Sequence, residues 1–312
     1  MIKTVAKAPL PVAENYIVKK QRLEPATLTG NEKRISIVTG IHGDELEGQY
    51  VCYEVQRRIR EQKELLTGIV DIYPALNPMG IDSITRGIPH FDLDMNRIFP
   101  GNKEGSMAEY LAAEIIKDVK GSDLCLDIHA SNIFLKEIPQ VRIHVNCAKI
   151  LLPMAKRLNI DYIWIHGAAT VLESTFAHSL NSIGTPVLVV EMGVGMRVTK
   201  QYCDQLTDGI FMEMKDLGIW QGEVGKPKTP IISEDGNVHY LNAGHAGIFL
   251  PKADHWSQVK KGEKIGEILD PLEGIMKEEV FSECDGVLFT LREYPVVSEG
   301  SLIGRILERS AE

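Results

Sequence analysis

The sequence predicts an α/β fold in which a sheet flanked by helices is followed by a smaller, β-rich domain. From about residue 34, short runs of β-branched residues alternate with longer helical patterns, which is typical of layered α/β proteins. Beyond about residue 229 the pattern changes to short valine- and isoleucine-containing runs broken by glycines, as in small barrels or sandwiches. Because 312 residues is about twice the common length of one domain, we expect two domains, 1–229 and 230–312.

The first half of the larger domain contains two predicted strands, two predicted helices and a long irregular segment. Residues 34–40 form a buried strand that runs directly into a helix, for which Asp44 is a candidate N-cap. The next strand is expected over 68–76. An irregular segment follows over 77–102, and a segment of this length is uncommon in a compact domain unless it builds a site. A capping-box pattern, serine followed three residues later by glutamate, then starts a helix over 106–120.

Further strands and helices complete the predicted sheet, which carries at least five strands. The strands are expected over 123–130, 141–146 and 185–193, and the helices near 147–158, 172–182 and 199–217. The last of these strands is almost wholly apolar, as expected of a strand that is buried in the sheet.

Composition and charge exclude several classes of protein. The hydrophobic share of 44% and the charged share of 25% are near the globular average, which excludes a disordered chain. A net charge of −9 opposes binding to phosphate backbones or anionic lipids, so we expect neither a nucleic-acid partner nor a membrane partner. The N-terminus lacks the apolar core of a signal peptide, and no stretch reaches the ~20 apolar residues that span a bilayer. We therefore expect a soluble, cytoplasmic protein.

Two segments carry candidate metal ligands. His42 and Glu45 lie in the string HGDE, where the first strand turns into the first helix, and His129 ends the strand over 123–130. Open α/β sheets place their ligands at the carboxyl edge, so the three side chains can meet there as the His, Glu, His set of catalytic zinc sites. Each element alone has a plainer interpretation. Glu45 also suits the dipole of a helix start, and His129 also suits a strand end that is hydrogen-bonded to a neighbour.

A carboxylate, Glu191, lies near the end of the apolar strand and is followed by Gly193 and Gly195. An acid in this position is paired, exposed in a cleft or shifted in pKa, and all three suit a general base beside a metal-bound water. The glycines favour close approach of a ligand, although they also fit a plain turn. A surface-exposed strand end is the alternative for Glu191.

The irregular segment contains four polar residues with a shared chemistry, namely Arg86, Asp94, Asn96 and Arg97. An arginine fork binds a carboxylate through two parallel hydrogen bonds, and an asparagine adds a donor. The last three residues are close enough in sequence to turn toward one pocket. Taken alone, they fit an ordinary surface loop equally well.

Four strings in this order resemble the succinylglutamate desuccinylase/aspartoacylase family of the zinc carboxypeptidase superfamily: HGDE, NPMGIDSITRGIPHFDLDMNRIFPG, DLCLDIHAS and VLVVEMGVG. The resemblance covers about 34–195 through these motifs, and the C-terminal β-rich domain through its placement. It implies a zinc-carboxypeptidase-like mixed sheet flanked by helices, with a smaller C-terminal β-rich domain.

The resemblance also implies a metal centre and its base. His42, Glu45 and His129 match the ligands of one Zn²⁺ per chain. Asp94 matches the acid that orients a ligand histidine, as metal sites generally require. Glu191 matches the glutamate that activates the zinc-bound water and passes its proton to the leaving amine.

Three further residues match positions that contact the substrate. Arg86 matches the arginine that polarises the scissile carbonyl and stabilises the oxyanion. Asn96 and Arg97 match the pair that holds the substrate's carboxylate. The C-terminal domain shows no clear counterpart of the residues that grip an acyl-side carboxylate in some relatives, so the acyl group stays open.

The predicted function is a zinc-dependent amidohydrolase that removes an acyl group from an N-acyl amino acid or a similar small metabolite with a free carboxylate. Its reaction is the attack of a zinc-bound water that Glu191 activates. Two alternatives stay open, a metallocarboxypeptidase acting on short peptides and a non-catalytic carboxylate-binding module. The sequence also leaves open the amino acid and the oligomeric state, a homo-oligomer included.

Overall fold

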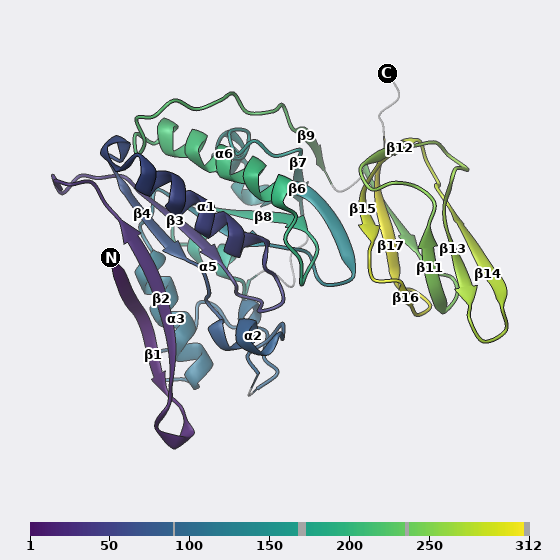
Figure 1. Ribbon diagram of the computed structural model, residues 1–312, viewed down its shortest axis with the longest axis horizontal. Coiled ribbons are helices and arrows are strands. Elements are labelled where there is room, and N and C mark those ends of the chain that lie inside the picture. The colour runs from purple at the N-terminus through teal and green to yellow at the C-terminus, as the bar shows by residue number, and fades with distance from the viewer. Residues whose placement is uncertain (90, 168–172, 235–236, 309–312) are drawn as a thin grey trace.

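A large mixed sheet with helices on both faces forms most of the protein, and a second, small sheet lies near the C-terminus (Figure 1). The computed structural model describes residues 1–89, 91–167, 173–234 and 237–308. The large sheet contains β1 (Ile2–Pro9), β2 (Asn15–Leu23), β3 (Arg34–Thr39), β4 (Ile69–Tyr73), β5 (Leu124–His129), β6 (Leu135–His144), β7 (Tyr162–His166), β8 (Val187–Gly193), β9 (Ile231–Glu234), β10 (Val238–Asn242), β12 (Ser257–Val259), β15 (Gly286–Arg292) and β17 (Leu302–Glu308). The small sheet contains β11 (Gly247–Pro251), β13 (Lys264–Asp270), β14 (Ile275–Phe281) and β16 (Val296–Val297).

Four parallel strands form the centre of the large sheet, in the order β4-β3-β5-β8. Antiparallel strands flank them on both sides, β2 beside β4 and β6 beside β8. The sequences of the central strands are almost continuously apolar. This is expected because helices bury these strands on both faces. Their carboxyl ends therefore meet along one edge, where the loops after β3, β5 and β8 lie together.

Helices cover the two faces of the sheet. The α-helices are α1 (Glu47–Glu61), α2 (Pro78–Ser83), α3 (Met107–Val119), α4 (Ala148–Ala155), α5 (Phe176–Asn181) and α6 (Lys200–Asp216). Buried residues of α1, α4 and α6 pack in one hydrophobic core, and those of α3 and α5 pack in another with the first hairpin, β1-β2. In α1 the buried Val51, Val55 and Ile59 recur at intervals of four, which places one apolar stripe against the sheet.

The strand β6 joins the central part of the sheet to the C-terminal β-rich region. Its first residues pair with β15, and β17 and β10 continue the sheet beyond it. Figure 1 shows most of these last strands as a lobe beside the main body. The fold class predicted from the sequence, a mixed sheet flanked by helices with a C-terminal β-rich region, is confirmed. The division into 1–229 and 230–312 stays a proposal.

Several local expectations need correction. Asp44 does not cap the first helix: α1 begins at Glu47 after an N-cap at Leu46, whose side chain makes no capping hydrogen bond. The backbone oxygen of Asp44 instead accepts a hydrogen bond from Met196, which ties the turn to the loop after β8. The strand expected over 141–146 begins earlier, as β6. Residue 172, the expected start of α5, lies outside the described residues.

The sequence predicts no segment apolar and long enough to span a bilayer, and the helices can be checked against this. Within the described part of the chain, no helix combines the length and apolar character needed to cross a membrane.

Candidate metal centre and active site

The candidate metal ligands lie on two turns at the carboxyl edge of the parallel strands. After β3 the chain passes through His42 and Glu45 before α1 begins, and His129 is the last residue of the neighbouring β5. Gly43 lets this turn pack tightly on α2, because a Cβ there would lie 2.0 Å from the carbonyl carbon of Gly80. The local sequence therefore fixes both ligand segments at the same edge.

His42, Glu45 and His129 form one buried group, which we call the His-Glu-His cluster. The Nδ1 of His42 lies 2.8 Å from Glu45 Oε1, and the Nδ1 of His129 lies 2.9 Å from Glu45 Oε2. One ligand atom from each residue lies within 4.8 Å of the others, and no other such group of three exists among the described residues. Two imidazoles and a carboxylate are the donor set of open catalytic zinc sites, so the residues fit that metal.

Each histidine of the cluster has a second carboxylate on its far side. The Nε2 of His42 lies 3.1 Å from Asp94 Oδ1, and the Nε2 of His129 lies 3.1 Å from Asp127 Oδ1. Metal-binding histidines are commonly oriented in this way through the ring nitrogen that does not bind the metal. The sequence assigned this role to Asp94 but gave none to Asp127. The Asp-x-His spacing on a strand was the available signal, because alternate residues share a face.

The charged groups of the cluster shift one another's pKa values. Burial by itself would raise the pKa of Glu45, but His42 and His129 outweigh it and the pKa falls below its ordinary value. Burial would lower the pKa of His129, but Asp127 and Glu45 outweigh it and the pKa is raised well above its ordinary value. A dense group of carboxylates around two imidazoles favours a cation at this position.

Glu191 lies on β8, next to the His-Glu-His cluster. It is the register partner of His129 on the neighbouring parallel strand, so the two side chains share one face of the sheet. Its Oε1 lies 3.4 Å from Arg142 Nη1. Burial raises the pKa of Glu191 above its ordinary value, although Arg142 opposes the shift. A carboxylate of this kind can accept and return a proton.

Arg86 lies at the edge of the cluster. Its Nη1 donates to Glu45 Oε1 at 2.9 Å, and its Nη2 lies 3.0 Å from His42 Nε2. The side chain is 40% exposed, so one part of it faces the cavity while the other holds the cluster. A guanidinium in this place can stabilise negative charge that develops beside the cluster.

The pair Asn96 and Arg97 lies in a tight turn beside Asp94. The Asp94 carboxylate accepts from the backbone nitrogen of Asn96 at 2.8 Å, and the Asn96 side-chain oxygen accepts from the backbone nitrogen of Phe176 at 2.9 Å. These bonds fix the turn against the start of α5. The side chain of Arg97 is 45% exposed, and its Nη1 lies 4.0 Å from Asp94 Oδ2.

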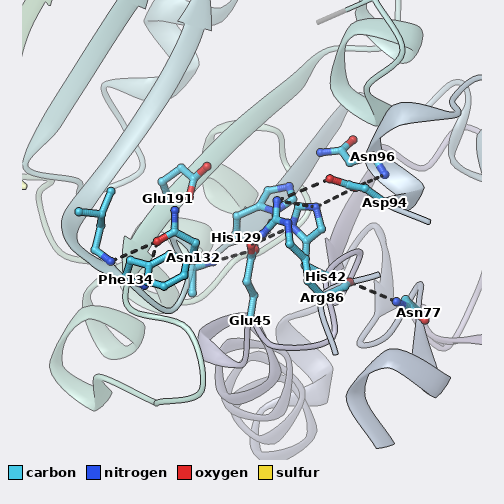
Figure 2. A network of polar contacts seen from close by, with 12 residues as sticks. His42, Glu45, Asn77, Arg86, Asp94, Asn96, His129, Asn132, Phe134 and Glu191 are labelled. Atoms are coloured by element: carbon cyan, nitrogen blue, oxygen red, sulfur yellow. Dashed lines mark hydrogen bonds and ion pairs between the residues drawn. The ribbon is translucent and has the colours of Figure 1, made fainter. Parts of the chain in front are cut away.

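All predicted site residues except Asp94 line one cavity of about 800 Å³. In Figure 2 the cluster lies at the centre, with Glu191 on one side of it and Asn96 on the other. The cavity wall also includes residues that the sequence did not point to, namely Glu137, Arg142, His144, His166, His178 and Arg305. Arg305 lies on β17, so the C-terminal β-rich region contributes to the wall.

The mixed sheet, the buried cluster at its carboxyl edge and the adjacent carboxylate are the features of a hydrolase, and comparison with known proteins identifies it as a deacylating one. The family described as the succinylglutamate desuccinylase/aspartoacylase catalytic domain matches residues 31–216, and the chain belongs to this family.

Individual relatives agree with this assignment. The chain is 28% identical over 300 residues to the N-alpha-acetyl-L-2,4-diaminobutyric acid deacetylase of Halomonas elongata, covering 94% of this chain and 84% of that protein. Its fold is similar to that of a succinylglutamate desuccinylase/aspartoacylase from Rhodobacter sphaeroides, with a TM-score of 0.83, 22% identity and coverage of 99% and 96%. It is also similar to the product-bound ectoine utilization protein EutE (DoeB) from Ruegeria pomeroyi, with a TM-score of 0.82, 18% identity and coverage of 97% and 93%.

Proposed function

We propose that the protein is a zinc-dependent deacylase that removes a short, uncharged acyl group from an N-acyl amino acid. The observation that carries the proposal is the buried His-Glu-His cluster beside Glu191, in a cavity that Arg97 also lines. Family membership supports it, as does the relative named as a deacetylase of an acetylated amino acid.

His42, Glu45 and His129 would hold one zinc ion per chain. The ion would supply Lewis-acid polarisation of the acyl carbonyl and a lowered pKa for water. Asp94 and Asp127 hold the two imidazoles in the orientation that turns both Nδ1 atoms toward Glu45.

Glu191 moves the proton. Its carboxylate accepts a proton from the attacking water as the water oxygen bonds to the amide carbon. It then returns this proton to the amide nitrogen as the carbon–nitrogen bond breaks. Arg86 stabilises the negative charge that forms on the carbonyl oxygen. The products are a carboxylic acid and a free amine.

Two cations of the cavity wall bear on whether the site accepts a charged or a neutral acyl group. Arg142 and Arg305 both lie within ion-pair distance of Glu137, and Arg142 also contacts Glu191. Their charges are therefore already balanced by carboxylates of the protein. The carboxylate of a succinyl group would have to displace one of these partners, whereas an acetyl group would not, which favours a neutral acyl group.

Arg97→Ala is expected to weaken substrates with a free α-carboxylate about 10- to 100-fold in kcat/KM, because a charge-assisted bidentate contact is lost. The methyl ester of the same substrate should change little. Lys103→Ala, which removes an exposed cation outside the cavity, is the matched control. Equal losses for the acid and the ester would contradict recognition of a carboxylate by Arg97.

The substrate class is tested by comparing an N-acetyl amino acid with its N-succinyl analogue and with di-, tri- and pentapeptides ending in the same residue. Because Arg305 of the C-terminal region helps to wall the cavity, we expect kcat/KM, measured as free amine released, to fall with peptide length. Rates that rise with length would favour a metallocarboxypeptidase. Tight binding of every compound without turnover would favour a non-catalytic carboxylate-binding module.

A further inference from the structure

Glu137 is the centre of a buried network that the proposed reaction does not use. Its side chain is fully buried, and each carboxylate oxygen accepts two hydrogen bonds. Oε1 accepts from Arg142 Nη2 at 3.1 Å and from Arg305 Nη1 at 2.8 Å. Oε2 accepts from Gln140 Nε2 at 2.8 Å and from Thr290 Oγ1 at 2.6 Å. We call these five residues the Glu137 network.

Arg142 joins this network to Glu191. One of its terminal nitrogens donates to Glu137, while the other lies 3.4 Å from Glu191 Oε1. Its guanidinium also lies 5.6 Å from the centre of the Trp164 ring, and that of Arg305 lies 5.7 Å from the same centre. A cation held by two carboxylates and an aromatic ring has little freedom to move.

The network spans three neighbouring strands of the large sheet. Glu137 and Arg142 lie on β6, Thr290 on β15 and Arg305 on β17. On one side β6 pairs with β8, and on the other Thr290 is the register partner of Glu137. The C-terminal β-rich region is thus connected to Glu191 through two charged side chains of β6.

We propose that Arg142 is a positioning residue that fixes the carboxylate of Glu191, and that Arg305 keeps Arg142 in place by sharing the charge of Glu137. Two positive charges, on Arg142 and Arg305, face two negative charges, on Glu137 and Glu191. The inference rests on the proposed function, because it takes Glu191 as the general base.

The distances explain how Arg305 affects Glu191 through Arg142. Arg142 is nearer to Glu137, at 3.1 Å, than to Glu191, at 3.4 Å. Without Arg305, Glu137 would be a buried carboxylate with one cationic partner instead of two, and it would attract Arg142 more strongly. Glu191 would then lose the contact that orients it, and a misplaced base slows the chemical step.

The test uses two variants of the full-length, metal-loaded protein. Arg305→Met is expected to lower kcat about 10- to 100-fold with KM almost unchanged, because the base is displaced while the substrate contacts remain. Arg305→Met combined with Glu137→Gln should regain most of the lost kcat, because no competing carboxylate then draws Arg142 from Glu191. Lys252→Met, which removes an exposed cation of the C-terminal region, is the control and should behave as the wild type.

Several results of this test would overturn the inference. A raised KM with unchanged kcat would make Arg305 a substrate contact, and a double variant as slow as the single one would remove Glu137 from the argument. Either result overturns the inference, as does an Arg305→Met variant with wild-type kcat. If Arg305→Met melts below the assay temperature, Arg142→Lys should retain more kcat than Arg142→Met at equal KM, and equal rates would overturn the inference.

Failure of the proposed function would give other results than failure of the positioning claim. A wild-type protein without deacylase activity, or a fully active Glu191→Gln variant, would overturn the proposed function itself. In that case a crystal structure of Arg305→Met still decides the positioning claim without an assay. A longer distance between Arg142 and Glu191 supports the claim, and an unchanged distance overturns it.

Discussion

Glu191→Gln is expected to reduce turnover by ~10²–10⁴-fold while the protein keeps its full metal content. The amide has the shape of the carboxylate but cannot accept the proton of the attacking water. The residue lies beside His129 on the neighbouring strand and is not a member of the His-Glu-His cluster, so the three proposed metal ligands stay intact. The measurement is kcat together with zinc per chain on one preparation.

A matched control substitution shows whether the effect is specific to Glu191 or follows the loss of any glutamate carboxylate. Glu114→Gln changes a glutamate on α3 that pairs with exposed lysines outside the cavity, and it should leave both quantities unchanged. A Glu191→Gln variant that lost its metal but kept its rate per zinc would show that Glu191 is a ligand or a structural residue.

His129→Ala is expected to lose most of its bound zinc and to lower kcat/KM by about 10³-fold or more. In the proposed metal site the histidine would supply one of three ligands, and it lies against Asp127, so its removal would open the site and leave Glu45 with one imidazole. Loss of several kcal/mol of stabilisation of the developing charge gives a rate effect of about this size. Zinc content after dialysis and kcat/KM are measured on the same sample.

The control for this variant is His239→Ala, which changes a histidine on β10 that pairs with Glu308 outside the cavity. It should keep both metal and activity. Full zinc and full activity in His129→Ala would remove His129 from the metal site.

The sequence was sufficient to predict that the cluster residues meet, because the reason is local. His42 and Glu45 follow one buried parallel strand and His129 ends its neighbour, so the geometry of a parallel sheet brings them to one edge. The Asp44 cap failed for an equally local reason. The chain stays in a turn until Glu47, and the backbone of Asp44 is held by the loop after β8 rather than by the helix.

The first hairpin was not predicted because a charge breaks its apolar alternation. Tyr16 and Val18 of β2 point inward, but the next inward residue is Lys20, which is 4% exposed. Its ammonium is satisfied by Asp71 and Asp118, which are distant in sequence. A buried ion pair of this kind leaves no periodic signal.

The Glu137 network was also beyond the reach of sequence patterns. Glu137 and Arg305 are 168 residues apart, and they meet only because β15 and β17 extend the sheet beyond β6. Pairing of this kind depends on the register of antiparallel strands, which no spacing along one segment records.

The most direct test of the central claim is a titration of the stripped wild-type protein with zinc, in which bound metal and the rate of amine release from an N-acetyl amino acid are measured in the same samples. If the His-Glu-His cluster is the reaction centre, the rate rises in proportion to bound zinc and reaches its maximum at about one ion per chain. Full activity in the stripped protein, or a rate independent of bound zinc, would contradict the account.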